Sequence, residues 1–155
     1  MIVAIFSAML GGCMHLAPAS MTPGTPEAAV RAQLGTPAHT YRDGADTLLE
    51  YPKGQTTYMV RLDARGQLAS YQQVLTSAHF ASVRIGHDDR QAILHAFGQP
   101  DSVQHYALSA TEAWLYRYKE QEIWNSIMYV EFDAGGRVKA MLNGPDPEFE
   151  RGHGR

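Results

Sequence analysis

Apolar residues recur at helical spacing in two stretches of the chain, and each stretch ends in a glycine followed two residues later by a proline. The stretches read VRAQLGTP at residues 30–37 and ILHAFGQP at residues 93–100. In each, two apolar side chains four residues apart share one helical face, the glycine suits the left-handed position past a helix end, and the proline stops the helix. Gly35 and Gly98 are 63 residues apart, which indicates a small unit repeated once.

Helix-start signals precede both stretches. Thr25 is a natural N-cap and a proline follows it, so the first helix is expected at residues 26–34. Asp88, with Gln91 three residues later, forms a capping-box pattern that starts the second helix and carries it to the second glycine. A shorter helix is expected at residues 76–83, just ahead of the second capped helix.

Between the helices, apolar and polar residues alternate as they do in half-buried strands. In residues 57–62 the side chains of Tyr58, Val60 and Leu62 share one face, and the next residues predict a hairpin turn with Gly66 at positive φ. The same order of elements returns after the second helix. The expected strands are residues 48–51, 57–62, 67–75, 113–118 and 126–132.

This repeated order predicts an α+β fold of two tandem units, each a pair of helices packed on a three-stranded antiparallel sheet. The first unit is expected at residues 25–75 and the second at residues 76–142. Residues 143–155 contain no apolar period, and we expect a flexible tail there.

Composition narrows the function classes. The 155 residues are 45% hydrophobic, enough for one globular domain or two small halves sharing a core. Thirteen basic and 16 acidic residues are scattered along the chain and leave a formal charge of −3. No run of lysine or arginine could follow a phosphate backbone, which argues against a nucleic-acid partner.

The N-terminus predicts export and lipidation. Residues 1–10 form an apolar run of signal-peptide length, and residues 10–13, Leu-Gly-Gly-Cys, resemble a bacterial lipobox. This resemblance implies a lipoprotein signal peptide at residues 1–12, diacylglyceryl attachment to the single cysteine, Cys13, and a tether at residues 13–24. The other interpretation is a buried apolar strand with an incidental cysteine. One cysteine excludes an internal disulfide in either case.

The second unit carries a pattern of glycine, proline and aromatic residues at set places along its helices and strands. The residues of this pattern are Gly86, Ile93, Gly98, Pro100, Trp114, Tyr116, Phe132, Asp133 and Gly136. With them, the sequence from residue 75 to residue 140 is similar to the SmpA/OmlA (BamE-like) family of bacterial outer-membrane lipoproteins, and the first unit matches it more weakly, with Leu49 where the family favours tryptophan. The resemblance implies a helix pair on a three-stranded sheet, and two such units side by side resemble the β-lactamase inhibitor protein fold.

Candidate catalytic and metal-binding residues are sparse. His87 and His95 are eight residues apart, whereas a pair of helical ligands needs a spacing of four, so we expect these histidines and His105 to be solvated. The pair Asp88 and Asp89 is explained by helix capping. No serine or cysteine lies in a recognisable nucleophile motif. We expect neither enzymatic activity, nor a metal site, nor a cofactor.

One segment differs between the units. The second unit has five more residues between corresponding strand positions, within residues 119–126, and they bring Ile123 and Trp124 to a hairpin tip. An exposed tryptophan beside an apolar residue is typical of a protein-contact hot spot, so both residues, together with Tyr118, are candidates for partner binding. The alternative is a longer, bent hairpin with Trp124 folded back on the sheet.

These observations lead to one functional expectation with an alternative. The sequence predicts a lipid-anchored protein on the periplasmic face of the outer membrane that binds an outer-membrane or periplasmic protein. By family resemblance it acts in outer-membrane protein assembly or envelope integrity, without enzymatic activity. The alternative is a periplasmic inhibitor of a hydrolase, either a peptidase or a cell-wall lytic enzyme.

Overall fold

The computed structural model describes residues 21–107 and 111–151. These residues form eight strands and four helices, and the strands make two four-stranded antiparallel sheets, ordered β1-β2-β3-β4 and β5-β6-β7-β8. The elements are α1 (Glu27–Leu34), β1 (His39–Asp43), β2 (Asp46–Lys53), β3 (Thr56–Leu62), β4 (Leu68–Gln73), α2 (Ser77–Phe80), α3 (Arg90–Phe97), β5 (Ser102–Tyr106), β6 (Thr111–Glu120), β7 (Trp124–Phe132), β8 (Val138–Pro145) and α4 (Pro147–Arg151).

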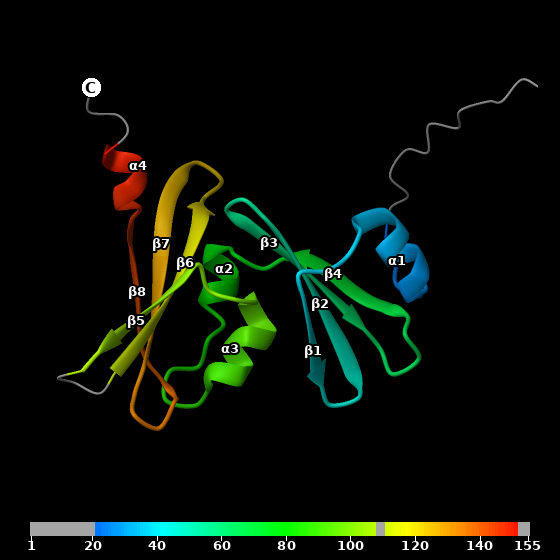
Figure 1. The fold of residues 1–155 in the computed structure, drawn as a ribbon, viewed down its shortest axis with the longest axis horizontal. Helices are drawn as coiled ribbons and strands as arrows, with labels where there is room; N and C mark the ends of the chain where they lie inside the picture. The colour runs from blue at the N-terminus through cyan, green and yellow to red at the C-terminus, as the bar shows by residue number, and fades with distance from the viewer. Residues whose placement is uncertain (1–20, 108–110, 152–155) are drawn as a thin grey trace, which may run out of the picture.

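The elements stack in four layers (Figure 1). The sheet β5–β8 comes first, then α2 and α3, then the sheet β1–β4, and α1 covers the far face. Helices α2 and α3 therefore lie between the two sheets. The hairpin of β6 and β7 and the short helix α4 lie at the end of the molecule opposite α1 (Figure 1).

Both faces of the first sheet are buried, because neighbouring apolar residues in its strands point to opposite faces of the sheet. On the α1 side, Val30 of the helix packs with Leu49 and Val60 in a small core. On the other side, Leu48 and Met59 join the larger core that also contains α2, α3 and the second sheet. A single core thus continues from one unit into the other, which holds the two sheets together.

Aromatic rings form the centre of the larger core. Phe80 of α2 stacks on Phe97 of α3 with ring centroids 4.7 Å apart, and it meets Tyr118 edge-on at 5.0 Å. Trp114 and Phe132 make a second edge-on pair at 4.8 Å. Such pairs add stability beyond the area they bury.

The repeat expected from the sequence is visible in backbone hydrogen bonds. In the first unit the N–H of Gly24 donates to the carbonyl of Leu68 at 2.7 Å, and in the second the N–H of Gly86 donates to Val138 at 2.8 Å. Helices α1 and α3 both end in a glycine at positive φ, as predicted, with φ of 82° at Gly35 and 81° at Gly98. The chain therefore enters and leaves the two helices along equivalent paths.

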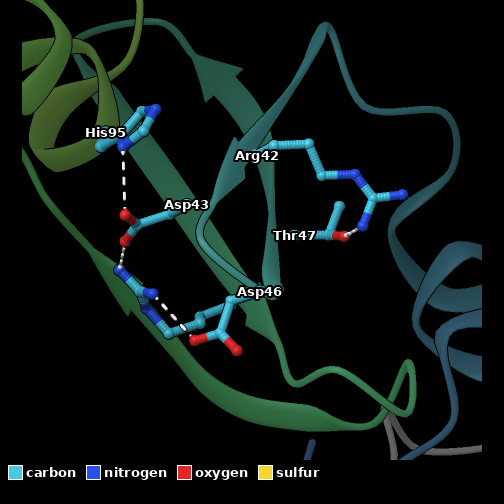
Figure 2. A network of polar contacts seen from close by, with 6 residues as sticks. Arg42, Asp43, Asp46, Thr47 and His95 are labelled. Carbon is cyan, nitrogen blue, oxygen red and sulfur yellow. Dashed lines mark hydrogen bonds and ion pairs between the residues drawn. The ribbon is translucent and has the colours of Figure 1, made fainter.

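Polar contacts join α3 to the first sheet (Figure 2). The Nδ1 atom of His95 on α3 lies 3.6 Å from Oδ1 of Asp43 at the end of β1. Arg61 donates to that same carboxylate at 2.8 Å and to Asp46 at 3.0 Å. The hydrogen bond from Arg61 lowers the pKa of Asp43, so the carboxylate stays charged where it faces the helix of the other unit.

The predicted fold class is wrong. The described residues are mostly β, each sheet has four strands where three were expected, and the first unit contains one helix within its described residues. The missed strands are β1, β5 and β8, each of which lies at an edge of its sheet. All five residues of β5 are exposed and β1 is mostly exposed, so neither strand carries the apolar alternation that sequence analysis detects.

Several element boundaries also differ from those expected from the sequence. The N-cap of α3 is Asp89, whose carboxylate accepts from the N–H of Ala92, while the expected cap, Asp88, accepts from the backbone and guanidinium of Arg84. Helix α1 begins one residue later than expected, after Pro26. Where a tail was expected from residue 143, β8 continues to its C-terminal proline and α4 follows. The expected signal peptide and lipidated cysteine lie outside the described residues.

Candidate functional site

The hairpin of β6 and β7 is the place where the two units differ most. Strand β6 has 10 residues against eight in β2, and β7 has nine against seven in β3. The extra length of the second unit therefore extends a regular hairpin beyond the body of the sheet. The predicted insertion is confirmed as a longer hairpin, and its tip is formed by residues 121–123.

The tip presents two apolar side chains to solvent. Ile123 is 67% exposed and Trp124 is 64% exposed, so the tryptophan is not folded back on the sheet. Gln121 and Glu122 have φ of 50° and 62°, a left-handed conformation that costs free energy in residues other than glycine. The N–H of Ile123 donates to the carbonyl of Glu120 at 3.1 Å and closes the turn.

A groove of about 640 Å³ lies beside this tip. The hairpin of β6 and β7, the end of β8 and α4 all contribute lining residues. Its lining combines the apolar side chains of Trp124, Pro145 and Phe149 with polar ones. The lining residues are Glu120, Trp124, Asn125, Ser126, Asn143, Gly144, Pro145, Asp146 and Phe149.

A hydrogen-bond network orders the base of the groove. Oε2 of Glu120 accepts from the hydroxyl of Ser126 at 2.9 Å and from Nδ2 of Asn143 at 3.0 Å. Oδ1 of Asn143 in turn accepts from the hydroxyl of Tyr118 at 3.1 Å. These bonds fix the direction of the Glu120 carboxylate before anything binds, which is the condition for a preorganised contact.

An ion pair holds α4 against the sheet. The side chain of Asp146 is fully buried and lies 3.1 Å from Nε of Arg117, whose Nη2 also lies 3.0 Å from Glu148. The Asp146 N–H donates to the carbonyl of Asn125, and its Oδ1 accepts from the N–H of Glu148. Asp146 is thus both the cap of α4 and the anchor that positions Phe149 at the rim of the groove.

The structure separates the three predicted contact residues. Ile123 and Trp124 lie at the exposed tip, but Tyr118 is 1% exposed and belongs to the core beneath α2. Tyr118 is therefore removed as a contact residue, because strand alternation turns it inward with Trp114 and Tyr116. Its hydroxyl donates to Asn143, which lines the groove beside the tip.

The sequence analysis missed the contribution of α4. Asp146 and Phe149 lie in the segment that was expected to be a loose tail, and Phe149 is 44% exposed. The sequence Asp-Pro-Glu at residues 146–148 was the available signal, because aspartate at an N-cap followed by proline at the first helical position marks a helix start.

The three histidines considered in the sequence differ in how far they are exposed to solvent. His105 is exposed, as expected for a solvated residue, and so is His87. The side chain of His95 is only 14% exposed because it lies between α3 and the first sheet, so the expectation of a solvated residue is wrong there. Within residues 21–107 and 111–151, no three histidine, cysteine or acidic residues are grouped as a metal ion would require.

None of the helices in the described part of the chain has the length and apolarity needed to cross a bilayer.

Comparisons with known proteins show no family. No protein-family model matches the chain, so the SmpA/OmlA resemblance finds no support there, and no curated protein matches it. Among solved structures, a DUF4309 family protein (YjgB) from Bacillus subtilis aligns over 78% of both chains with 11% identity and a TM-score of 0.35. A candidate beta-lactamase inhibitor protein from Streptococcus mutans aligns over 83% of this chain and 88% of its own, with 14% identity and a TM-score of 0.31. Likeness at this level carries no argument about function.

Proposed function

We propose that this protein is a lipid-anchored, non-enzymatic protein-binding module of the bacterial envelope. The observation that carries the proposal is the exposed pair Ile123 and Trp124 on an extended hairpin beside the groove of about 640 Å³. Interface energy concentrates in a few large side chains, tryptophan above all, set next to a concave surface. An ordered turn that holds such side chains away from the protein body favours contact with another macromolecule.

The anchoring part of the proposal depends on residues 10–13, Leu-Gly-Gly-Cys, at the end of an apolar run. If Cys13 carries acyl chains, the protein is held on a membrane surface, and the outer membrane facing the periplasm is the proposed location. Growth of cells with a clickable fatty acid tests this step. The wild type should be labelled and Cys13→Ala should not; labelling that persists in the variant counts against the lipobox.

The binding part is tested by photocrosslinking in cells. A photoreactive phenylalanine analogue at position 124 should capture a partner, and the same analogue at position 142 is the matched control. Leu142 is 54% exposed but lies on β8, on the face of the sheet opposite Trp124, as strand register shows. Identical crosslinked products from both positions would show that position 124 has no special contact.

An inhibitor of a hydrolase is the second candidate. The specific observation that favours it is the conformation of the tip, since two consecutive non-glycine residues, Gln121 and Glu122, hold positive φ and present Ile123 in a fixed direction. A projecting, preorganised apolar turn can enter an enzyme cleft at little entropic cost. The identity of the crosslinked partner separates the two functions: barrel-assembly proteins support an envelope scaffold, and a single peptidase or lytic enzyme supports an inhibitor.

A further inference from the structure

The groove at the hairpin continues along the inner side of β8 toward α2. A second hollow of about 340 Å³ adjoins the first, and both are lined by Glu120 and Asn143. The second hollow lies between α2 and the sheet. Its other lining residues are Ser77, Phe80, Ala81, Val83, Ile85, Tyr118, Met128 and Met141.

The combined groove is apolar at both ends and acidic in the middle. Trp124 and Phe149 form one end, and Ile85, which is 55% exposed, lies at the other. Between them the carboxylate of Glu120 is held by Ser126 and by the asparagine that both hollows share. This order suits a ligand whose apolar groups flank one polar group.

The charge of the middle section favours a cation. Within the described residues Glu120 makes no ion pair, although it accepts two hydrogen bonds. The neighbouring Lys119 alternates to the opposite face of the sheet. Arg117 is already shared by Asp146 and Glu148, so one positive charge faces two negative ones. Of the charged residues that line the two hollows, Asp146 is paired with Arg117, and Glu120 is the one without an ion pair among the described residues.

The groove also offers backbone partners to an extended chain. Strand β8 is the edge of its sheet, and an edge strand accepts an added strand through unpaired main-chain groups. In addition, Oδ1 of Asn125 in the groove wall is buried and has no hydrogen-bond partner among the described residues. A donor supplied by a bound peptide would satisfy this acceptor.

We propose that this groove binds an extended peptide segment of the partner protein, in which an arginine or lysine pairs with Glu120 and apolar side chains on either side fill the two hollows. This inference rests on the proposed protein-binding function and adds the chemistry of the segment that is bound. Side-chain spacing in an extended peptide places alternate residues on the same face, so the basic residue and its apolar neighbours are expected two positions apart.

The test uses two labelled heptapeptides that differ at one position: Ser-Phe-Thr-Arg-Thr-Phe-Ser, and the same peptide with glutamate in place of arginine. Fluorescence anisotropy with the full chain should show saturable binding of the arginine peptide, tighter than binding of the glutamate peptide by about tenfold. Equal affinity for both peptides, or no saturable binding of either one, overturns the proposal.

Two variants assign the preference to the groove. Glu120→Gln keeps a side-chain oxygen for Ser126 and Asn143 but removes the charge, and it should reduce the tenfold preference to about twofold or less. Glu122→Gln is the matched control, because Glu122 lies on the same hairpin outside both hollows and its removal should leave the preference intact. A preference that survives in Glu120→Gln, with folding verified by circular dichroism, places the charged contact elsewhere and overturns the proposal.

Failure of this inference can be told from failure of the proposed function. If position 124 still crosslinks a partner in cells while the peptides show no charge preference, the protein binds through the hairpin but not in the way inferred here. If position 124 captures nothing beyond the position 142 control, the proposed function itself fails.

Discussion

The carboxylate of Glu50 accepts a hydrogen bond from the backbone N–H of Gln99 at 3.1 Å, although the two residues belong to different units. Glu50 is 2% exposed, and its other oxygen accepts from the hydroxyl of Tyr41. Burial and this hydrogen bond raise the pKa of Tyr41 above its usual range. The glutamate is therefore a buried polar link across the junction of α3 with the first sheet.

Replacement of Glu50 should weaken this junction. Glu50→Leu leaves the hydroxyl of Tyr41 and the N–H of Gln99 without their acceptor, and we expect a loss of about 2 kcal/mol in the free energy of unfolding. Glu50→Gln retains one acceptor and should lose less. Urea denaturation followed by circular dichroism measures both variants. A Glu50→Leu protein as stable as wild type would show that the cost of burying the carboxylate cancels its hydrogen bonds.

The two helix-ending glycines provide a matched pair for a second prediction. Gly35 and Gly98 have nearly the same φ, so alanine at either position should cost about 1–2 kcal/mol of backbone strain. At Gly98 an added Cβ also overlaps the Glu50 carboxylate, whereas nothing lies within 4 Å at Gly35. Gly98→Ala should therefore be the more destabilising variant in thermal unfolding. In a Glu50→Ala background the excess should disappear; if it remains, the overlap is not its cause.

In a third prediction, an aromatic residue of the core and one of the candidate contact surface should differ in their effect on the free energy of unfolding. Phe97 is fully buried among aromatic rings, so Phe97→Ala should lower the free energy of unfolding by about 3–5 kcal/mol. Trp124→Ala removes a side chain that is mostly exposed and should change it by no more than about 0.5 kcal/mol. Both values come from the same denaturation series. A large loss for Trp124→Ala would mean that the tryptophan supports the fold and that its binding phenotypes cannot be interpreted simply.

Low pH should weaken the polar contacts of Asp43 that Figure 2 shows. The pKa of Asp43 in the folded protein lies below its ordinary value of 3.8 because Arg61 donates to it. The stabilisation is therefore fully present above that value and is lost as pH falls through the folded pKa. Asp43→Asn should flatten the pH dependence of the unfolding free energy below about pH 4. Glu131→Gln, which removes a carboxylate without an ion pair in the described structure, is the control, and an equal effect from it would contradict the assignment.

Part of the candidate site was predictable from the sequence. Comparison of the two units located the longer hairpin, and with it Ile123 and Trp124, because an insertion between matched strands must extend the hairpin that joins them. The same reasoning failed for Tyr118: strand alternation turns it to the inner face, where Phe80 of α2 packs against it. It also failed for Asp146, whose buried side chain pairs with Arg117 of a different strand.

The sequence by itself determined the local features: the glycine and proline that end each helix, the strands in which apolar and polar residues alternate, and the longer hairpin of the second unit. These depend on φ, on side-chain alternation and on chain length between neighbouring elements, all of which act over a few residues. Only the tertiary structure decided that α3 contacts both sheets, that the edge strands β1 and β5 pair, and that β8 and α4 complete the groove beside Trp124. Those features depend on contacts between segments far apart in the chain, for which the burial of one residue is set by the position of another.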